Sequence, residues 1–130
     1  MTIKIEHLGC VVQDPIEVAK WYVTNLGFQI VRRLEGSTNT HFLADGSGQV
    51  MVEIYNNPKV TVPDYRSIDP LVLHLAFTVD DLVAVRTRLL AAGATAEGDI
   101  TTTLAGDQLA MLRDPWGFAV QLAKRREPMV

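Results

Sequence analysis

The sequence has a single cysteine, Cys10, so no disulfide can form within the chain. Because Cys10 stands in an apolar segment, we expect a buried thiol and not a nucleophile. Positive charge is also scarce, since 12 Lys and Arg residues stand against 15 Asp and Glu residues and the net charge is −3. A nucleic-acid-binding surface needs clustered basic residues, so we expect no nucleic-acid partner.

Long apolar segments are absent as well. No apolar run approaches the roughly 18 residues that a membrane-spanning helix needs, and the N-terminal segment lacks the pattern of a secretion signal. We therefore expect a cytoplasmic protein without a membrane partner. The composition of a disordered chain is missing too, because 48% of the residues are hydrophobic and 21% are charged. The 130 residues suit one compact domain.

An internal repeat is the most informative feature that is present. The segment HLGCVVQD begins at His7 and the similar segment HLAFTVDD begins at His74. Each histidine is followed, at the same spacing, by an aspartate, Asp14 or Asp81. The apolar residues between them predict a strand in each copy. The two halves of the chain are therefore expected to share one architecture.

Each copy continues with a segment of helical pattern that ends in a glycine, residues 15–27 and 82–93. Asp14 stands where a helix N-cap accepts hydrogen bonds from backbone amides, and Pro15 suits the first helical position. Gly27 and Gly93 are expected to close the two helices in the left-handed conformation. The apolar face of the first helix, expected to pack on a sheet, consists of Ala19, Tyr22, Val23 and Leu26.

Short alternating segments follow each helix and predict strands. Three such segments lie in the first copy and two in the second: residues 28–34, 39–45, 49–56, 108–113 and 118–124. A further edge strand near residues 97–101 would complete the match between the copies. We therefore predict an α+β fold of two βαβββ modules within one domain, residues 1–130. The modules are residues 1–56 and 71–130, and the proline-containing residues 57–70 form a linker.

Polar residues interrupt four of the apolar strands at matched positions. By strand alternation, each shares a face with apolar or small neighbours, and a buried carboxylate at Glu53 would need a partner. The spacing from His7 to Glu53 nearly equals that from His74 to Gln121, so the second pair repeats the first. If the modules pair about a pseudo-two-fold axis, these four side chains can hold one divalent cation, with Zn, Ni, Fe, Co and Mn suited to the donors.

These residues also have structural interpretations. A strand histidine is commonly a hydrogen-bonded core residue, an edge-strand carboxylate can face water, and Gln121 can hydrogen-bond a pocket. Matched positions favour the ligand interpretation for His7 and His74. The substrate pocket is predicted to include His41, Met51 and Tyr55. Three arginines are able to hold a carboxylate or phosphate, although surface arginines are usually solvated: Arg32, Arg33 and Arg113.

The sequence resembles the vicinal oxygen chelate superfamily, which includes glyoxalase I, methylmalonyl-CoA epimerase, extradiol dioxygenases, fosfomycin-resistance enzymes and bleomycin-binding proteins. The resemblance rests on EHLGCVVQD with WYVTNLGF, on MVEIY, on LHLAFTVDDL with AAGA, and on DPWGFAVQL. It implies two βαβββ modules that form a glyoxalase-like, cup-shaped mixed sheet. The implied ligands, on the first and last strand of each module, fall on His7, Glu53, His74 and Gln121. Gln121 departs from the glutamate that is usual in metal-dependent members.

The resemblance implies a metal-dependent lyase or isomerase of the glyoxalase type, which acts on a small oxygenated substrate through a metal-bound enediolate. Glu53 is then the ligand able to act as the catalytic base. Because the last-strand glutamate commonly takes part in that proton transfer, Gln121 leaves two alternatives open. One is a metal-free protein that binds a small molecule such as a drug. The other is an Fe(II) extradiol-type dioxygenase. Members of the superfamily generally pair, so we also expect a homodimer.

Overall fold

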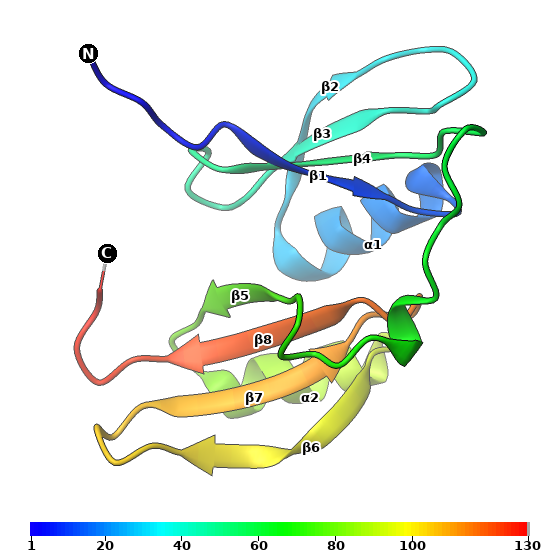
Figure 1. The fold of residues 1–130 in the computed structure, drawn as a ribbon. Coiled ribbons are helices and arrows are strands. Elements are labelled where there is room, and N and C mark those ends of the chain that lie inside the picture. Colours follow the sequence, from blue (N-terminus) through cyan, green and yellow to red (C-terminus); the bar gives the residue numbers. More distant parts are fainter. Residues whose placement is uncertain (130) are drawn as a thin grey trace. The chain divides into compact units, whose positions relative to one another are not determined.

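The structure is a computed structural model that describes residues 1–129. The chain divides into two compact units, Met1–Pro63 (unit 1) and Asp64–Val130 (unit 2). Each unit consists of one four-stranded sheet with one α-helix on one of its faces (Figure 1). In residues 1–129, no helix is long and apolar enough to cross a membrane.

Unit 1 is a βαβββ module. Its elements are β1 (His7–Val11), α1 (Pro15–Leu26), β2 (Gln29–Arg33), β3 (His41–Ala44) and β4 (Met51–Tyr55). The strands lie in the order β1-β4-β3-β2. Strand β1 runs parallel to β4, whereas β4 and β3, and β3 and β2, are antiparallel. The first and last strands of the module are therefore neighbours, although helix α1 and two strands separate them in the sequence.

Helix α1 begins and ends where its sequence indicates. The Asp14 carboxylate accepts a hydrogen bond of 3.3 Å from the backbone amide of Glu17, and Pro15 occupies the first turn. Gly27 closes the helix at φ 67°, in the left-handed conformation that glycine adopts without steric cost. Local chemistry alone thus explains both ends of this helix.

The buried face of α1 differs from the predicted one. Val18, Ala19 and Tyr22 are at most 5% exposed, whereas Val23 is 38% exposed. Together with the buried Pro15, the first three follow the i, i+3, i+4, i+7 spacing of a single helical stripe. The prediction of Val23 as a core residue was wrong. The helix face that packs on the sheet includes Val18 and leaves Val23 exposed.

The two faces of the unit 1 sheet have different surroundings. Leu43 and Ile54 point to one face and are 1% and 3% exposed, as expected for the side that α1 covers. Cys10 pairs with Ile54 on that side and is half-buried, not fully buried as predicted. Residues of the other parity, among them Glu53, point to the opposite face, which α1 leaves open.

Unit 2 repeats this architecture. After a short 3-10 helix, η1 (Tyr65–Ser67), it contains β5 (Leu75–Thr78), α2 (Leu82–Ala91), β6 (Thr95–Thr102), β7 (Gln108–Arg113) and β8 (Ala119–Lys124). The strand order β5-β8-β7-β6 and the parallel pairing of β5 with β8 match those of unit 1. The predicted α+β fold of two βαβββ modules, each with a mixed four-stranded sheet, is confirmed.

The core of unit 2 lies between α2 and its sheet. Leu112 and Leu122 are 0% exposed, and Leu82 and Leu89 on the helix are 1% exposed. The Asp81 carboxylate caps α2 by accepting a hydrogen bond of 3.0 Å from the amide of Ala84. Gly93 directly follows the C-cap Ala92 at φ 105°, and the amides of Gly93 and Ala94 donate hydrogen bonds to the carbonyls of Leu90 and Leu89, so this glycine closes α2 as predicted.

The boundary between the units falls within the predicted linker, residues 57–70. Residues 64–70 belong to unit 2, and Arg113 holds them there. Its guanidinium donates hydrogen bonds of 2.9 to 3.0 Å to the carbonyls of Tyr65, Ile68 and Gly117, and it also pairs with Glu97. Arg113 is 5% exposed, so this buried cation is satisfied by protein groups and is not free to hold a ligand.

Candidate functional site

The parallel pairing of β1 with β4 places His7 and Glu53 on the same face of the unit 1 sheet. Gly9 is the register partner of Glu53, and His7, two residues earlier, is the partner of Met51. The Nε2 atom of His7 lies 3.9 Å from Oε1 of Glu53. Their side chains are 34% and 23% exposed, so both are accessible to a small molecule. The structure thus brings together the first predicted pair.

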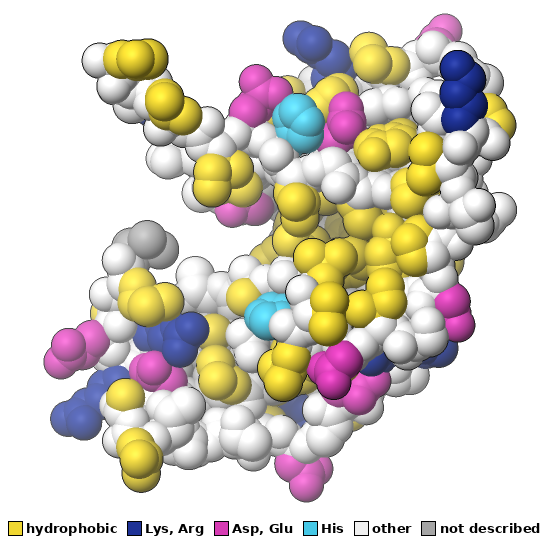
Figure 2. All heavy atoms as spheres, viewed as in Figure 1, with side chains coloured by type: hydrophobic (Ala, Val, Ile, Leu, Met, Phe, Trp, Pro, Cys, Tyr) yellow, Lys and Arg dark blue, Asp and Glu magenta, His cyan; other side chains and the backbone are white. Residues whose placement is uncertain are grey.

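Two neighbours fix the orientation of the His7 ring. Its Nδ1 atom lies 2.9 Å from the Glu6 carboxylate, and its ring stacks edge-on against Phe42 with centroids 5.5 Å apart. An ionised carboxylate can only accept a hydrogen bond, so Nδ1 of a neutral His7 ring is the protonated nitrogen. The Nε2 atom then carries a free lone pair and faces Glu53. Figure 2 shows histidine and acidic side chains side by side on the surface of this unit.

The glycine at position 9 leaves room on β1 for the side chains of Glu53 and Tyr55. A Cβ atom at Gly9 would lie 3.4 Å from Oε1 of Glu53 and 3.8 Å from the Tyr55 hydroxyl. Both side chains therefore lean over a position that carries no side chain of its own. Met51 and Tyr55, predicted to line the substrate pocket, share this face with Glu53 because they stand two residues on either side of it in β4.

The structure does not bring His41 to this face. His41 pairs with Ile54 on the side that α1 covers and is 2% exposed. Its Nδ1 atom lies 2.6 Å from the carbonyl oxygen of Asn39. These contacts describe a buried histidine of the core, on the opposite face from Glu53, and not a side chain that faces a substrate.

Unit 2 contains the second predicted pair. The Nδ1 atom of His74 lies 2.7 Å from the carbonyl oxygen of Pro70, so Nδ1 donates and Nε2 has a free lone pair in the neutral ring. Gln121 is half-buried on β8, in register with Ala76 of β5. His74 directly precedes β5, two residues before Ala76. Both histidines thus bond through Nδ1 to an acceptor near in sequence.

The described residues, 1–129, contain no cluster of three or more His, Cys, Asp and Glu side chains able to hold a metal ion. A complete metal site is therefore not shown. What unit 1 contributes is a pair of donors, and what unit 2 contributes is a histidine and an amide. That all four residues share one cation stays a prediction.

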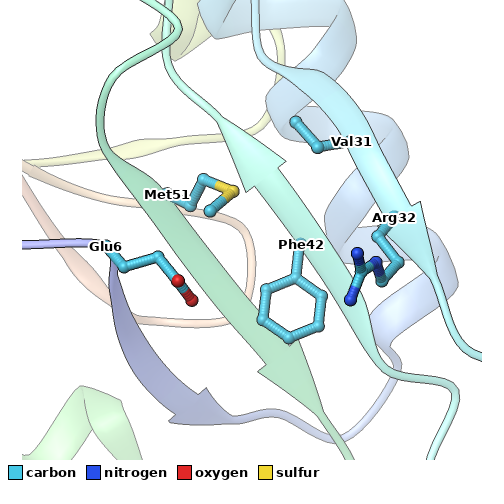
Figure 3. A pocket seen from close by; sticks show the side chains of 5 residues that line it. All are labelled: Glu6, Val31, Arg32, Phe42 and Met51. Atoms are coloured by element: carbon cyan, nitrogen blue, oxygen red, sulfur yellow. The ribbon is translucent and has the colours of Figure 1, made fainter.

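A small cavity opens on the same face of the unit 1 sheet. Its volume is about 140 Å³, and Figure 3 shows its lining residues, Glu6, Val31, Arg32, Phe42 and Met51. Phe42 and Met51 form its apolar floor and belong to β3 and β4. The cavity adjoins the predicted ligand pair, because Phe42 contacts the His7 ring and Glu6 bonds to it.

Two residues of this site, Glu6 and Phe42, were not predicted from the sequence. Strand alternation would direct Glu6 away from His7, but β1 begins at His7, so Glu6 lies before the regular strand. No sequence pattern indicates that contact. Phe42 shares the face of Glu53 through the antiparallel register of β3 and β4, which alternation within one strand does not reveal. Knowing which strands are neighbours would have identified it.

Asp107, in unit 2, has the clearest electrostatic perturbation. The backbone amide of Arg126 donates a hydrogen bond of 2.9 Å to its carboxylate, and Arg125 adds an ion pair at 3.1 Å. These interactions, the amide first, lower the pKa of Asp107 below its ordinary value of 3.8. The carboxylate joins the loop before β7 to the segment after β8, so its effect is on the stability of unit 2.

Comparisons with known proteins support the architecture. A glyoxalase family protein from Bacillus cereus is 18% identical, with 95% of each chain covered and a TM-score of 0.81. An antibiotic-binding protein from Streptomyces sp. CB03234 is 22% identical, with 96% of this chain and 98% of the other covered and a TM-score of 0.72. A glyoxalase family protein from Enterococcus faecalis is 24% identical, with coverages of 93% and 97% and a TM-score of 0.72.

These structures show the same fold, and their low identity carries no activity over to this chain. No functionally curated protein gives a significant match. Residues 4–122 match the sequence model of the Glyoxalase/Bleomycin resistance protein/Dioxygenase superfamily, and this match spans nearly the whole chain. The chain therefore belongs to the glyoxalase/bleomycin resistance protein/dioxygenase superfamily.

Proposed function

We propose that this protein is a metal-dependent lyase or isomerase that acts on a small oxygenated molecule. The proposed metal ligands are His7, Glu53, His74 and Gln121. The observation that supports this function is the bonding of the two histidines. Each directs Nδ1 to an acceptor, the Glu6 carboxylate or the Pro70 carbonyl, and leaves Nε2 free. Metal-binding histidines usually have this arrangement, because the second hydrogen bond orients the ring and selects the tautomer.

The donors of unit 1 fit a metal ion in chemistry and in spacing. Two ligands at the usual metal distance stand about 3.4 Å apart in a tetrahedral site. The separation of 3.9 Å between His7 Nε2 and Glu53 Oε1 therefore requires a movement of about 0.5 Å. That separation is too long for a hydrogen bond, so the lone pairs of His7 Nε2 and Glu53 Oε1 both remain available to a metal ion. With Gln121 as a neutral ligand, a divalent cation and its ligands would carry a net charge of about +1.

Glu53 is the proposed base. A divalent cation supplies Lewis acidity, which makes a C–H bond beside a coordinated carbonyl easier to ionise. The side chain of Glu53 is 23% exposed, so a substrate carbon can approach its carboxylate. In an isomerisation, Glu53 would take a proton from one carbon and return it to the neighbouring carbon. An amide cannot accept that proton at neutral pH, so Gln121 is assigned to binding.

Metal content is the direct test. Protein purified without chelator is expected to hold about one transition metal per four-residue set, and added Zn²⁺, Ni²⁺ or Fe²⁺ is expected to raise the Tm of chelator-treated protein. His7→Ala and Glu53→Gln should each abolish both effects. Glu17→Gln, an exposed change on α1, is the matched control for Glu53→Gln and should abolish neither. Protein that holds no metal and gains no stability from any of the three ions would refute the proposal.

A second function is favoured by Gln121 and by the cavity beside His7. Without a second carboxylate the ligand set is weaker, and the fold is shared with an antibiotic-binding protein. The alternative is thus a metal-free protein that binds a small molecule. If His7→Ala binds the same compounds as the parent protein, this alternative is supported. If binding is lost with the metal, it is refuted.

A further inference from the structure

The cavity on the open face of the unit 1 sheet has two chemically distinct parts. Phe42 and Met51 form an apolar floor, and charged side chains stand at its sides. Figure 3 shows Glu6 and Arg32 on opposite sides of the Phe42 ring, with Glu6 coming from the segment before β1 and Arg32 from β2. A molecule in the cavity would meet an aromatic ring and a guanidinium group together.

A β-bulge directs Arg32 to this face. The register of β2 with β3 shifts between Ile30 and Arg32, so that Ile30 pairs with Leu43 and Arg32 pairs with Phe42. In a regular ladder Val31 would take the place opposite Phe42, and Arg32 would point to the face that α1 covers. The extra residue thus turns Arg32 toward the cavity. Bulges often re-aim a side chain beside a binding site.

Arg32 has no partner of its own within residues 1–129. No hydrogen bond or ion pair of its guanidinium is found there, whereas the Glu6 carboxylate across the cavity bonds to His7. The Glu6 carboxylate is thus engaged by the His7 ring, whereas the donors of the Arg32 guanidinium remain open to a ligand. A guanidinium presents a planar fork of donors that matches the oxygens of a carboxylate or phosphate.

We propose that this cavity binds the anionic group of a small acid, with Arg32 holding the anion and the apolar part of the molecule on Phe42 and Met51. The volume of about 140 Å³ is well below the roughly 300–1,000 Å³ of drug-sized sites, so the occupant is a small acid or the acidic end of a larger molecule. As a statement about the substrate this rests on the proposed function, since the cavity adjoins His7. Its test does not require a metal.

The experiment uses benzoate, phenyl phosphate and the neutral isostere benzamide with chelator-treated protein. Titrations followed by NMR of backbone amides and arginine Nε–H groups report both affinity and location. Benzoate or phenyl phosphate is expected to shift signals of Arg32 and Phe42 in a saturable manner. Benzamide should bind about tenfold more weakly or worse, as expected from the loss of a charge-assisted hydrogen bond. The stronger of the two anions identifies a carboxylate or a phosphate as the preferred group.

The adjacent arginine is the matched control. Arg33 pairs with His41, on the opposite face of the same strand. Arg32→Gln should weaken binding of the anions about tenfold or more and leave benzamide unchanged, whereas Arg33→Gln should leave both within about twofold. Both residues are exposed, so neither change should prevent folding, and Tm measurements check this.

Three results would overturn the inference: no saturable binding of either anion, equal affinity for benzamide, or equal losses in Arg32→Gln and Arg33→Gln. Metal measurements on the same protein separate the two proposals. Anion binding without metal binding would refute the proposed enzyme and leave this cavity assigned. Metal binding without anion binding would refute the cavity's role and leave the enzyme.

Discussion

The carboxylate of Glu6 is expected to raise the affinity of His7 for a metal ion. Glu6 accepts the hydrogen bond from His7 Nδ1 at 2.9 Å, which holds Nε2 toward Glu53 and fixes the tautomer that can bind a metal. Two substitutions separate the effect of the hydrogen-bond acceptor from the effect of its negative charge. Glu6→Gln keeps an oxygen acceptor and removes the charge, whereas Glu6→Ala removes both.

The size of the effect follows from how exposed the pair is. Loss of such a partner typically weakens metal binding about 10- to 100-fold. The Glu6 side chain is 71% exposed and that of His7 34%, so water screens the charge and replaces part of the lost hydrogen bond. We therefore expect Glu6→Ala to fall near the lower limit, at about tenfold. Glu6→Gln should lie between it and the parent protein.

The assay is competition for Zn²⁺ with a chromophoric chelator, which measures affinity without an enzymatic reaction. Imidazole ¹⁵N NMR supplies a second measurement, since His7 should carry its proton on Nδ1 in the parent protein and exchange between tautomers in Glu6→Ala. Glu17→Ala, a surface change away from this face, is the control. If Glu6→Ala binds Zn²⁺ as tightly as Glu17→Ala, the assigned role of Glu6 is wrong.

Three further predictions concern stability, each measured by urea unfolding. Leu122→Ala should lower the free energy of unfolding by about 2–5 kcal/mol, because Leu122 is 0% exposed. Its control is Leu104→Ala at a fully exposed position, which should change the free energy of unfolding by less than about 0.5 kcal/mol. Asp81→Ala should cost about 1 kcal/mol by removing the N-cap of α2. Asp107→Asn should destabilise the protein near neutral pH. Because the native pKa of Asp107 lies below 3.8, this carboxylate stabilises the fold above that pH, and its contribution disappears as the pH falls through the native pKa.

Each of these has an outcome that contradicts it. Equal losses in Leu122→Ala and Leu104→Ala would deny the core position of Leu122. An Asp81→Ala protein as stable as its parent would show that the Asp81 N-cap does not stabilise α2. A difference between Asp107→Asn and the parent that stays constant down to strongly acidic pH would show that its carboxylate does not titrate as described.

The predictions from sequence were strongest where a residue acts through its neighbours along the chain. Asp14 and Asp81 cap the two helices, and Gly27 and Gly93 close them, because these roles depend on hydrogen bonds and backbone angles within a few residues. The repeat then allowed one module to be predicted from the other. Alternation within β4 also placed Met51 and Tyr55 on the face of Glu53 correctly.

The predictions failed where the answer depends on which strand lies next to which. Residues 41–44 read His-Phe-Leu-Ala, and apolar residues of both parities leave the core face undecided. The register with β4 resolves it by burying His41 and turning Phe42 to the open face. The sequence names both Arg32 and Arg33 as able to hold an anion, and the bulge that turns Arg32 toward the cavity is visible only in the pairing of β2 with β3.

By itself, the sequence determined the two βαβββ modules and the matched positions of His7 with Glu53 and His74 with Gln121. Those follow from periodicity, which is a local property of the chain. Tertiary structure decided what each side chain meets: Glu6 at the ring of His7, four protein groups around Arg113, and an open cavity beside Arg32. The Glu6–His7 contact joins adjacent residues where the chain has not yet entered the regular strand, and the other contacts depend on strand register and loop packing, which no local pattern encodes.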